Sequence, residues 1–268
     1  MIAALLGSVG GLTLGLTGGV GAVLTVPLLV FGLQQPVHNA VLISLFIVSS
    51  TAFFSLLSHQ NRAQIDWPVA FWVMLGGCLS AVMCSQLGEQ LSENTLLVLY
   101  SFLLFAIGIY VPLKEYTASS QTKMTKHQRQ VVPKRLTTIR PLLFFLGIGC
   151  GALSGIMGLG AGLVLVPSLR HLTKDSDEMV IPTSLLIVIP IAMVSIFTHL
   201  QQHALQGQVI ILYLIGSTFG IWLSSNWLQK HKYLQAQKML LAIFLIALSA
   251  WIGSQQLPIM SDVLLAHN

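Results

Sequence analysis

Eight long apolar runs, separated by short polar stretches, limit what this chain can fold into. They cover about residues 2–31, 39–58, 67–87, 95–113, 141–169, 180–198, 207–228 and 235–255. Most are close to the ~20 residues that a helix needs to cross about 30 Å of hydrocarbon. Only 8% of the residues are charged, whereas a soluble domain carries roughly 25%. The sequence therefore predicts an all-α polytopic membrane protein.

The two halves of the chain align with each other without a gap at an offset of 140 residues, and a fixed internal period indicates a repeat. In the first run of each half the matches are Gly7, Gly11, Gly15, Gly18, Val26, Pro27 and Leu29 with Gly147, Gly151, Gly155, Gly158, Val166, Pro167 and Leu169. Later matches are Ser44, Ser55, His59, Gly76 and Ser85 with Ser184, Ser195, His199, Gly216 and Ser225. We predict two transmembrane repeats, residues 1–113 and 141–268, joined by a basic linker, residues 114–140.

The basic residues discriminate between two topologies. If all eight runs cross the membrane, the thirteen Lys and Arg residues divide eight to five between its sides. If the first and fifth runs instead enter and return on one side, all thirteen share one face, while Glu89 and Glu93 lie on the other. The positive-inside rule favours this second topology and makes the linker cytoplasmic. Each half then has three crossings plus one re-entrant broken helix, and the halves form an inverted repeat of the kind found in secondary transporters.

The two re-entrant segments, residues 11–27 and 151–167, are rich in glycine, and each predicts two half-helices around a break. Such a break is tolerated where it is buried in protein or lines a wet cavity, and the second half-helix then presents free N–H groups to an anion. The predicted backbone donors are Gly18, Gly19, Gly21, Gly158, Gly160 and Gly162, supported by the hydroxyls of Thr17, Ser44, Ser154, Thr183 and Ser184. Close helix packing through small residues is the alternative use of these glycines.

No Asp, Glu, Lys or Arg lies deep in an apolar run, which disfavours a cation pump, because pumps usually need such groups. His59 and His199 form the titratable pair that the repeat preserves. They are candidates for gating or proton coupling, with anchoring at the membrane interface as the alternative.

Features of other protein classes are missing from the sequence. The three cysteines lack metal-ligand spacing, and the glycine clusters lack the surroundings of a nucleotide loop. The linker has no stacking aromatics of the kind that bind nucleic acid. We therefore expect no enzyme activity, no metal or other cofactor and no nucleic-acid partner; the partners are the bilayer and a small anion, and a homo-oligomer is compatible with the sequence.

Two segments that each end in Val-Pro, residues 15–27 and 155–167, resemble the sulfite exporter TauE/SafE family. The duplicated layout, the basic central loop and the signature Thr183-Ser184-Leu185 resemble it too, although the first half reads Ile43-Ser44-Leu45 there. The resemblance implies a bacterial inner-membrane permease for sulfite, sulfonates or related sulfur oxyanions or organic anions. Secondary transport by alternating access around a midplane site follows as the expected mechanism. A passive anion channel and a non-transporting membrane scaffold are the alternatives.

Overall fold

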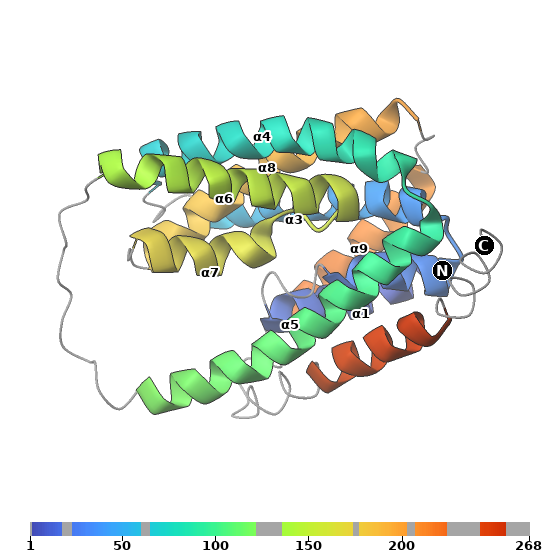
Figure 1. Cartoon of the computed structure of the whole chain (residues 1–268). Coiled ribbons are helices and arrows are strands. Elements are labelled where there is room, and N and C mark those ends of the chain that lie inside the picture. Colours follow the sequence, from blue (N-terminus) through green and yellow to red (C-terminus); the bar gives the residue numbers. More distant parts are fainter. Residues whose placement is uncertain are drawn as a thin grey trace, which may run out of the picture.

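The regular elements of the computed structural model are helices (Figure 1). The structure describes residues 2–17, 23–59, 65–121, 136–173, 177–202, 207–223 and 242–255. In chain order the elements are α1 (Ile2–Thr17), α2 (Thr25–Pro27), a π-helical turn η2 (Leu28–Gly32), α3 (Val37–His59), α4 (Trp67–Gln90), α5 (Glu93–Gln121), α6 (Leu136–Met157), α7 (Gly162–Thr173), α8 (Asp177–Leu200) and α9 (Gly207–Leu223), followed by the helix Ala242–Gln255. The all-α prediction is confirmed for these residues.

Four of the described helices are long and apolar enough to cross a membrane. Their candidate spans are Val37–Leu57, Trp67–Gln90, Arg140–Met157 and Met179–Leu200, from α3, α4, α6 and α8. Four shorter apolar helices accompany them: Ile2–Thr13, Glu93–Ile109, Gly207–Leu223 and Ala242–Gln255. Each of the eight predicted apolar runs therefore contains at least one described helix.

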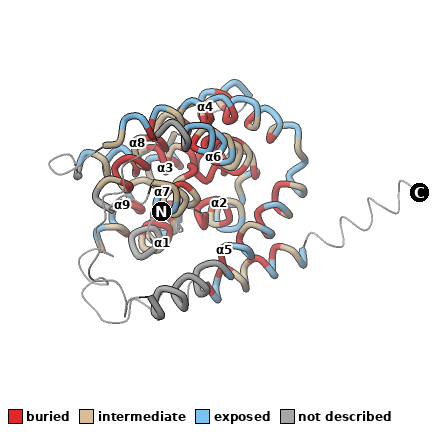
Figure 2. The backbone as a smooth tube through the Cα atoms, turned by 60° about the vertical axis from the view of Figure 1, so that its left-hand side comes forward, coloured by how far each residue is buried: buried red, intermediate tan, exposed pale blue. Residues whose placement is uncertain are grey.

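Large apolar side chains point outward from the bundle. Phe102 on α5 is 74% exposed, Phe197 on α8 is 68% exposed and Phe145 on α6 is 66% exposed. In Figure 2 the outward faces of α4 and α5 are largely exposed, whereas the chain around α2 and α3 is buried or half-buried. Burying a side chain of this size is worth about 1.5–3 kcal/mol in water, so a belt of them is stable only against lipid. The molecule is an integral membrane protein.

Helices α3 and α8 form the centre of the bundle. Buried side chains of α3 belong to two apolar clusters, since Val41 packs with the helices around α2 and α5 while Val48 packs with α4, α6 and α7. Helix α8 likewise contributes Ile196 to the first cluster and Ile187 to the second. Any movement of one cluster relative to the other therefore involves these two helices.

The helix ends define two ends of the bundle. At the linker end, to the left in Figure 1, α3 and α7 end and α4, α6 and α8 begin; at the far end, α1, α3 and α5 begin and α4 and α8 end. Helices α6 and α7 run in opposite directions, so this pair starts and finishes at the linker end. The predicted break in the fifth apolar run is present at residues 158–161. The corresponding break in the first run falls at residues 18–22, outside the described part of the chain.

Two helix pairs, α1 with α9 and α4 with α6, are packed through glycine. A Cβ atom on Gly7 would overlap the carbonyl oxygen of Tyr213, and a Cβ atom on Gly147 would overlap that of Val73. These residue numbers differ by 140 within each matched position. The same offset relates Gly11 against Ser217 to Gly151 against Gly77, and Gly216 against Ala4 to Gly76 against Phe144. These glycines allow two backbones to touch, which is a common use of small residues in membranes.

Candidate functional site

The hairpin tip, residues 158–161, is a sharp reversal between α6 and α7. The N–H group of Gly158 donates to the carbonyl oxygen of Ser154 at 2.9 Å and closes α6. Gly158 and Gly160 then adopt φ angles of +66° and +64°, Ala161 follows at 54°, and the N–H group of Gly162 donates to the carbonyl oxygen of Gly160. A residue with a Cβ atom pays about 1–2 kcal/mol in this left-handed region. The two glycines therefore allow the chain to reverse here.

The tip is packed tightly against α3. The hydroxyl of Ser44 donates to the carbonyl oxygen of Gly158 at 2.9 Å. A Cβ atom on Gly158 would lie 2.8 Å from the carbonyl oxygen of Val41, and a Cβ atom on Gly160 would overlap the side chain of Val48. Three consecutive turns of α3 thus contact a turn of four residues, and the position of the tip is fixed by α3.

Helix α8 lies on the other side of the tip with more room. A Cβ atom on Gly162 would meet its nearest neighbour, Cγ2 of Val188, at 3.6 Å, an ordinary van der Waals distance. Close by, the hydroxyls of Ser154 on α6 and Ser85 on α4 are fully buried and have no hydrogen-bond partner among the described residues. Buried hydroxyls without a partner are costly, so both are candidates for binding a polar ligand.

The structure separates the predicted hydroxyls. Ser44 lies at the tip, whereas Thr183 and Ser184 donate within α8, to the carbonyl oxygens of Met179 and Ile181. Thr183 also accepts a hydrogen bond from the N–H group of Asp66, just before α4. Within the described residues, neither α8 hydroxyl has a hydrogen bond to the tip.

Several predicted site residues lie outside the described part of the chain. Gly18, Gly19 and Gly21 belong to the segment 18–22, and the side chains of Thr17 and His59, the last residues of α1 and α3, are not described. The structure thus brings together Ser44, Gly158, Gly160 and Gly162, the part of the predicted anion site that it describes.

His199 is paired with Glu89 inside the bundle. Its Nδ1 atom contacts Oε1 of Glu89, and its Nε2 atom lies 3.0 Å from the carbonyl oxygen of Gly155 on α6. The side chains of His199 and Glu89 are 1% and 4% exposed. His38, at the start of α3, places Nδ1 3.6 Å from the second Glu89 oxygen and is 15% exposed. Anchoring at the membrane interface does not fit a histidine so deeply buried.

The burial of Glu89 was missed by the sequence analysis, which assigned this residue to the polar outer face. The apolar run ends at residue 87, but α4 continues to Gln90 and carries the carboxylate into the bundle. The available signal was a single acid, two residues beyond an apolar run, on the face that lacks Lys and Arg. Its partner is 110 residues away in the sequence.

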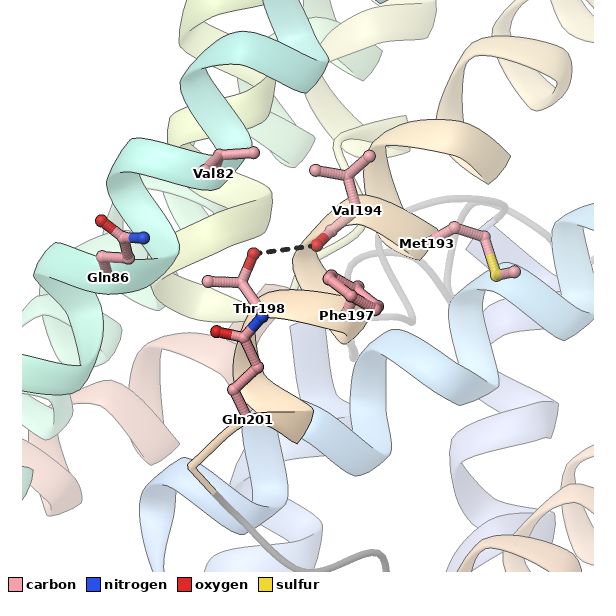
Figure 3. A pocket seen from close by; sticks show the side chains of 7 residues that line it. All are labelled: Val82, Gln86, Met193, Val194, Phe197, Thr198 and Gln201. Atoms are coloured by element: carbon pink, nitrogen blue, oxygen red, sulfur yellow. Dashed lines mark hydrogen bonds between the residues drawn. The ribbon is translucent and has the colours of Figure 1, made fainter.

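A groove of about 460 Å³ opens between α4 and α8, next to the Glu89–His199 pair. It is lined by Val82, Gln86, Met193, Val194, Phe197, Thr198 and Gln201 (Figure 3). The hydroxyl of Thr198, the neighbour of His199, donates to the carbonyl oxygen of Val194 at 3.0 Å. Neither this groove nor a much smaller cavity beside Asp66 includes the hairpin tip.

The lipid-facing apolar belt and the broken helix held between α3 and α8 define a polytopic membrane protein with a discontinuous helix, a feature of secondary transporters. The model of the family described as sulfite exporter TauE/SafE matches residues 3–252. The chain therefore belongs to the sulfite exporter TauE/SafE family and is a membrane transporter. Family membership indicates a transporter rather than an enzyme.

Relatives with the name "Probable membrane transporter protein" occur in bacteria and archaea. One from Xylella fastidiosa strain Temecula1 is 27% identical over 216 residues, 80% of this chain and 79% of the relative. One from strain 9a5c of the same species has the same identity and coverage. A protein of Methanocaldococcus jannaschii is 25% identical over 140 residues, 52% of this chain and 48% of that protein. No solved structure matches this chain.

Proposed function

We propose that this protein is a secondary transporter of small anions, with sulfite, sulfonates or related sulfur oxyanions or organic anions as substrates, and that it works by alternating access. The observation that carries the proposal is the matched packing of α1 on α9 and of α4 on α6, in which each glycine contact recurs at an offset of 140 residues. Matched interfaces support two equivalent halves, and equivalent halves can exchange two equivalent states that open to opposite sides.

The direction of the helices supports an inverted relation between these halves. The α6–α7 pair begins and finishes at the linker end, whereas α1 begins and η2 finishes at the far end (Figure 1). Arg140 and Arg170, the described basic residues, belong to the helix ends at the linker end, while Glu89 and Glu93 belong to the far end. This asymmetry supports a bacterial inner-membrane protein with the linker end in the cytoplasm.

The anion site of the proposal is the hairpin tip, together with its counterpart formed by Thr17, Gly18, Gly19 and Gly21. At the tip, the N–H groups of Gly158 and Gly162 donate within the turn. The N–H group of Gly160 has no such bond among the described residues, and the unpartnered hydroxyl of Ser154 lies one turn before the break. The N-terminus of α7 adds the positive end of a helix dipole. These features favour an anion over a cation.

Burial of the tip supports an occluded site. Residues 158–161 are buried, with Ser44 and Val48 of α3 directly against them. An anion therefore reaches Gly160 only when the tip and α3 separate. Movement of one apolar cluster relative to the other provides this separation, because α3 belongs to both.

Counterflow of radiolabelled sulfite into proteoliposomes tests the proposal. Saturable uptake that is stimulated by unlabelled sulfite inside the vesicles is the expected result. Val48→Ala/Gly160→Ala is compared with Val48→Ala alone, since both variants relieve the overlap at the tip and differ by one methyl group beside the proposed donor. We expect uptake to fall about tenfold, which corresponds to a loss of about 1.4 kcal/mol of binding. Gly149→Ala is the control, because no atom lies within 4 Å of the new Cβ.

The alternatives give different results. Flux that does not saturate and is not stimulated by internal sulfite indicates a passive anion channel. An absence of flux with sulfite, sulfonates and organic anions indicates a non-transporting scaffold. Equal uptake by the folded double variant and by Val48→Ala removes the backbone donor of Gly160 from the proposal while leaving transport intact.

A further inference from the structure

We propose that Glu89 and His199 form a proton-binding site that holds α4 against α8 while the proton is bound, and that the proton is the ion coupled to transport. The second part of this proposal rests on the function proposed above. The first part rests on the geometry of the pair, which is buried, joins two helices far apart in the sequence, and contacts a third helix beside the hairpin tip.

The hydrogen-bond partners fix the number of protons in the site. The carbonyl oxygen of Gly155 can only accept, so Nε2 of His199, at 3.0 Å, carries a hydrogen. The contact between Nδ1 and the Glu89 carboxyl then needs one further proton, which lies either on the imidazole or on the carboxyl group. Both arrangements leave the pair with no net charge. If that proton departs, a nitrogen lone pair faces a buried carboxylate.

Loss of the proton therefore opens the contact. A buried carboxylate without a partner is strongly unfavourable, and turning the imidazole to offer its hydrogen to Glu89 would break the bond to Gly155. The deprotonated pair is relieved when α4 and α8 separate and water enters. Protonation of buried histidines switches helix interfaces by the same physics.

The surroundings leave this proton as the main source of compensating charge. Among the described residues, the titratable group next to Glu89 from α3 is His38, with Nδ1 at 3.6 Å. Helix α6 contributes the uncharged carbonyl of Gly155, and Glu93 at the start of α5 is exposed. No Lys or Arg of the described residues belongs to this end of the bundle. His38 is the more exposed histidine of the two and lies on the route between the pair and the far end.

The pair is positioned to affect the anion site. Gly155 lies one turn before the reversal at residues 158–161, so α6 is held at the base of the hairpin tip by His199. The repeat preserves the histidine, as His59, but replaces the acid by Gln229 at the matched position. A proton site built from a carboxylate and an imidazole therefore belongs to one half of the chain, and it takes up its proton at the far end.

Spin labels at Gln86 and Phe197 measure whether α4 and α8 separate when the proton leaves. Both residues line the groove beside the pair and come from α4 and α8 respectively (Figure 3). The labels are attached to cysteines in a variant without Cys78, Cys84 and Cys150, reconstituted in lipid nanodiscs. Between about pH 5 and about pH 8, where histidine changes charge, we expect a second, longer distance to grow in as the pH rises. Glu89→Gln retains a neutral hydrogen-bonding group and should lose this pH response.

Two further variants make the distance experiment decisive. Glu93→Gln removes a nearby exposed acid and should keep the full pH response. His199→Gln should lose it, and replaces Glu89→Gln if that variant does not fold. A distance that is independent of pH in the parent protein, or a full response in both Glu89→Gln and His199→Gln, overturns the proton-binding site.

The same variants in proteoliposomes separate this inference from the proposed function. With sulfite as the probe, a pH gradient should accelerate uptake by the parent protein and have no effect on uptake by Glu89→Gln. Uptake that ignores the gradient in the parent protein overturns coupling to the proton. If no sulfite flux occurs but the distances respond to pH through Glu89, the proposed function and the coupling fail, and the proton-binding site stands.

Discussion

Substituting Gly160 by alanine should destabilise the protein more than any other glycine substitution near the hairpin tip. Gly160 has a φ angle of +64°, and its new Cβ atom would overlap the side chain of Val48. The left-handed conformation costs about 1–2 kcal/mol for alanine, and overpacking in a filled core costs about 1–3 kcal/mol. The two effects together predict a loss of about 2–5 kcal/mol in the free energy of unfolding.

The apparent melting temperature of purified protein in detergent measures this loss. A change of 1 kcal/mol moves the melting temperature by roughly 2–4 °C in chains of about 200 residues, so Gly160→Ala should lower it by roughly 4–20 °C. Gly162→Ala is the matched control two residues away, because its Cβ atom meets Val188 at 3.6 Å. That control should melt at or slightly above the temperature of the parent protein, since alanine is the better helix former by about 1 kcal/mol.

Val48→Ala divides the loss into its two causes. In a double-mutant cycle, removal of the Val48 side chain relieves the overlap and leaves the cost of the left-handed backbone. The double variant should therefore be more stable than the sum of the two single changes predicts. If Gly160→Ala melts within about 2 °C of the parent protein, a shift of less than about 1 kcal/mol, the described geometry of the turn is wrong.

Two further predictions concern the interfaces. Gly11→Ala and Gly151→Ala should each lower the free energy of unfolding by about 1–3 kcal/mol, and by similar amounts, because each new Cβ atom overlaps a backbone carbonyl at a matched position; unequal melting temperatures would contradict equivalent interfaces. Ser44→Ala leaves the buried carbonyl of Gly158 without its partner and should lower the free energy by about 1–3 kcal/mol. Ser254→Ala, on an exposed serine, is the control for thermal unfolding.

Periodic features of the fold could be predicted from the sequence. The apolar runs predicted the helices because the hydrophobic thickness of a bilayer sets a minimum length for each crossing. The glycines of residues 151–167 predicted the break, since positive φ angles at Gly158 and Gly160 need residues without a Cβ atom. Gly7 and Gly147 were recognised as a repeated pair, and the structure adds that both pack against the backbone of another helix.

Contacts between distant segments could not be predicted in the same way. Helical periodicity predicts which residues share a face, but it does not predict which helix covers that face. Nothing in the local sequence of Glu89 indicates His199 as its partner, because the two residues come from different halves of the chain. The hydroxyl of Thr183 was predicted to bind the anion, and it instead bonds to the backbone of Asp66 and Met179 in this conformation.

The packing of α1 on α9 has a consequence for biosynthesis. Helix α1 is the first element to leave the ribosome, yet its glycine-lined face is covered by residues 207–223, close to the end of the chain. During most of translation this face is exposed to lipid or to whatever protein inserts the chain into the bilayer. A chain that stops before residue 207 has no α9 and leaves Gly7 and Gly11 uncovered. The bundle is therefore closed late in synthesis, by joining its first helix to one of its last.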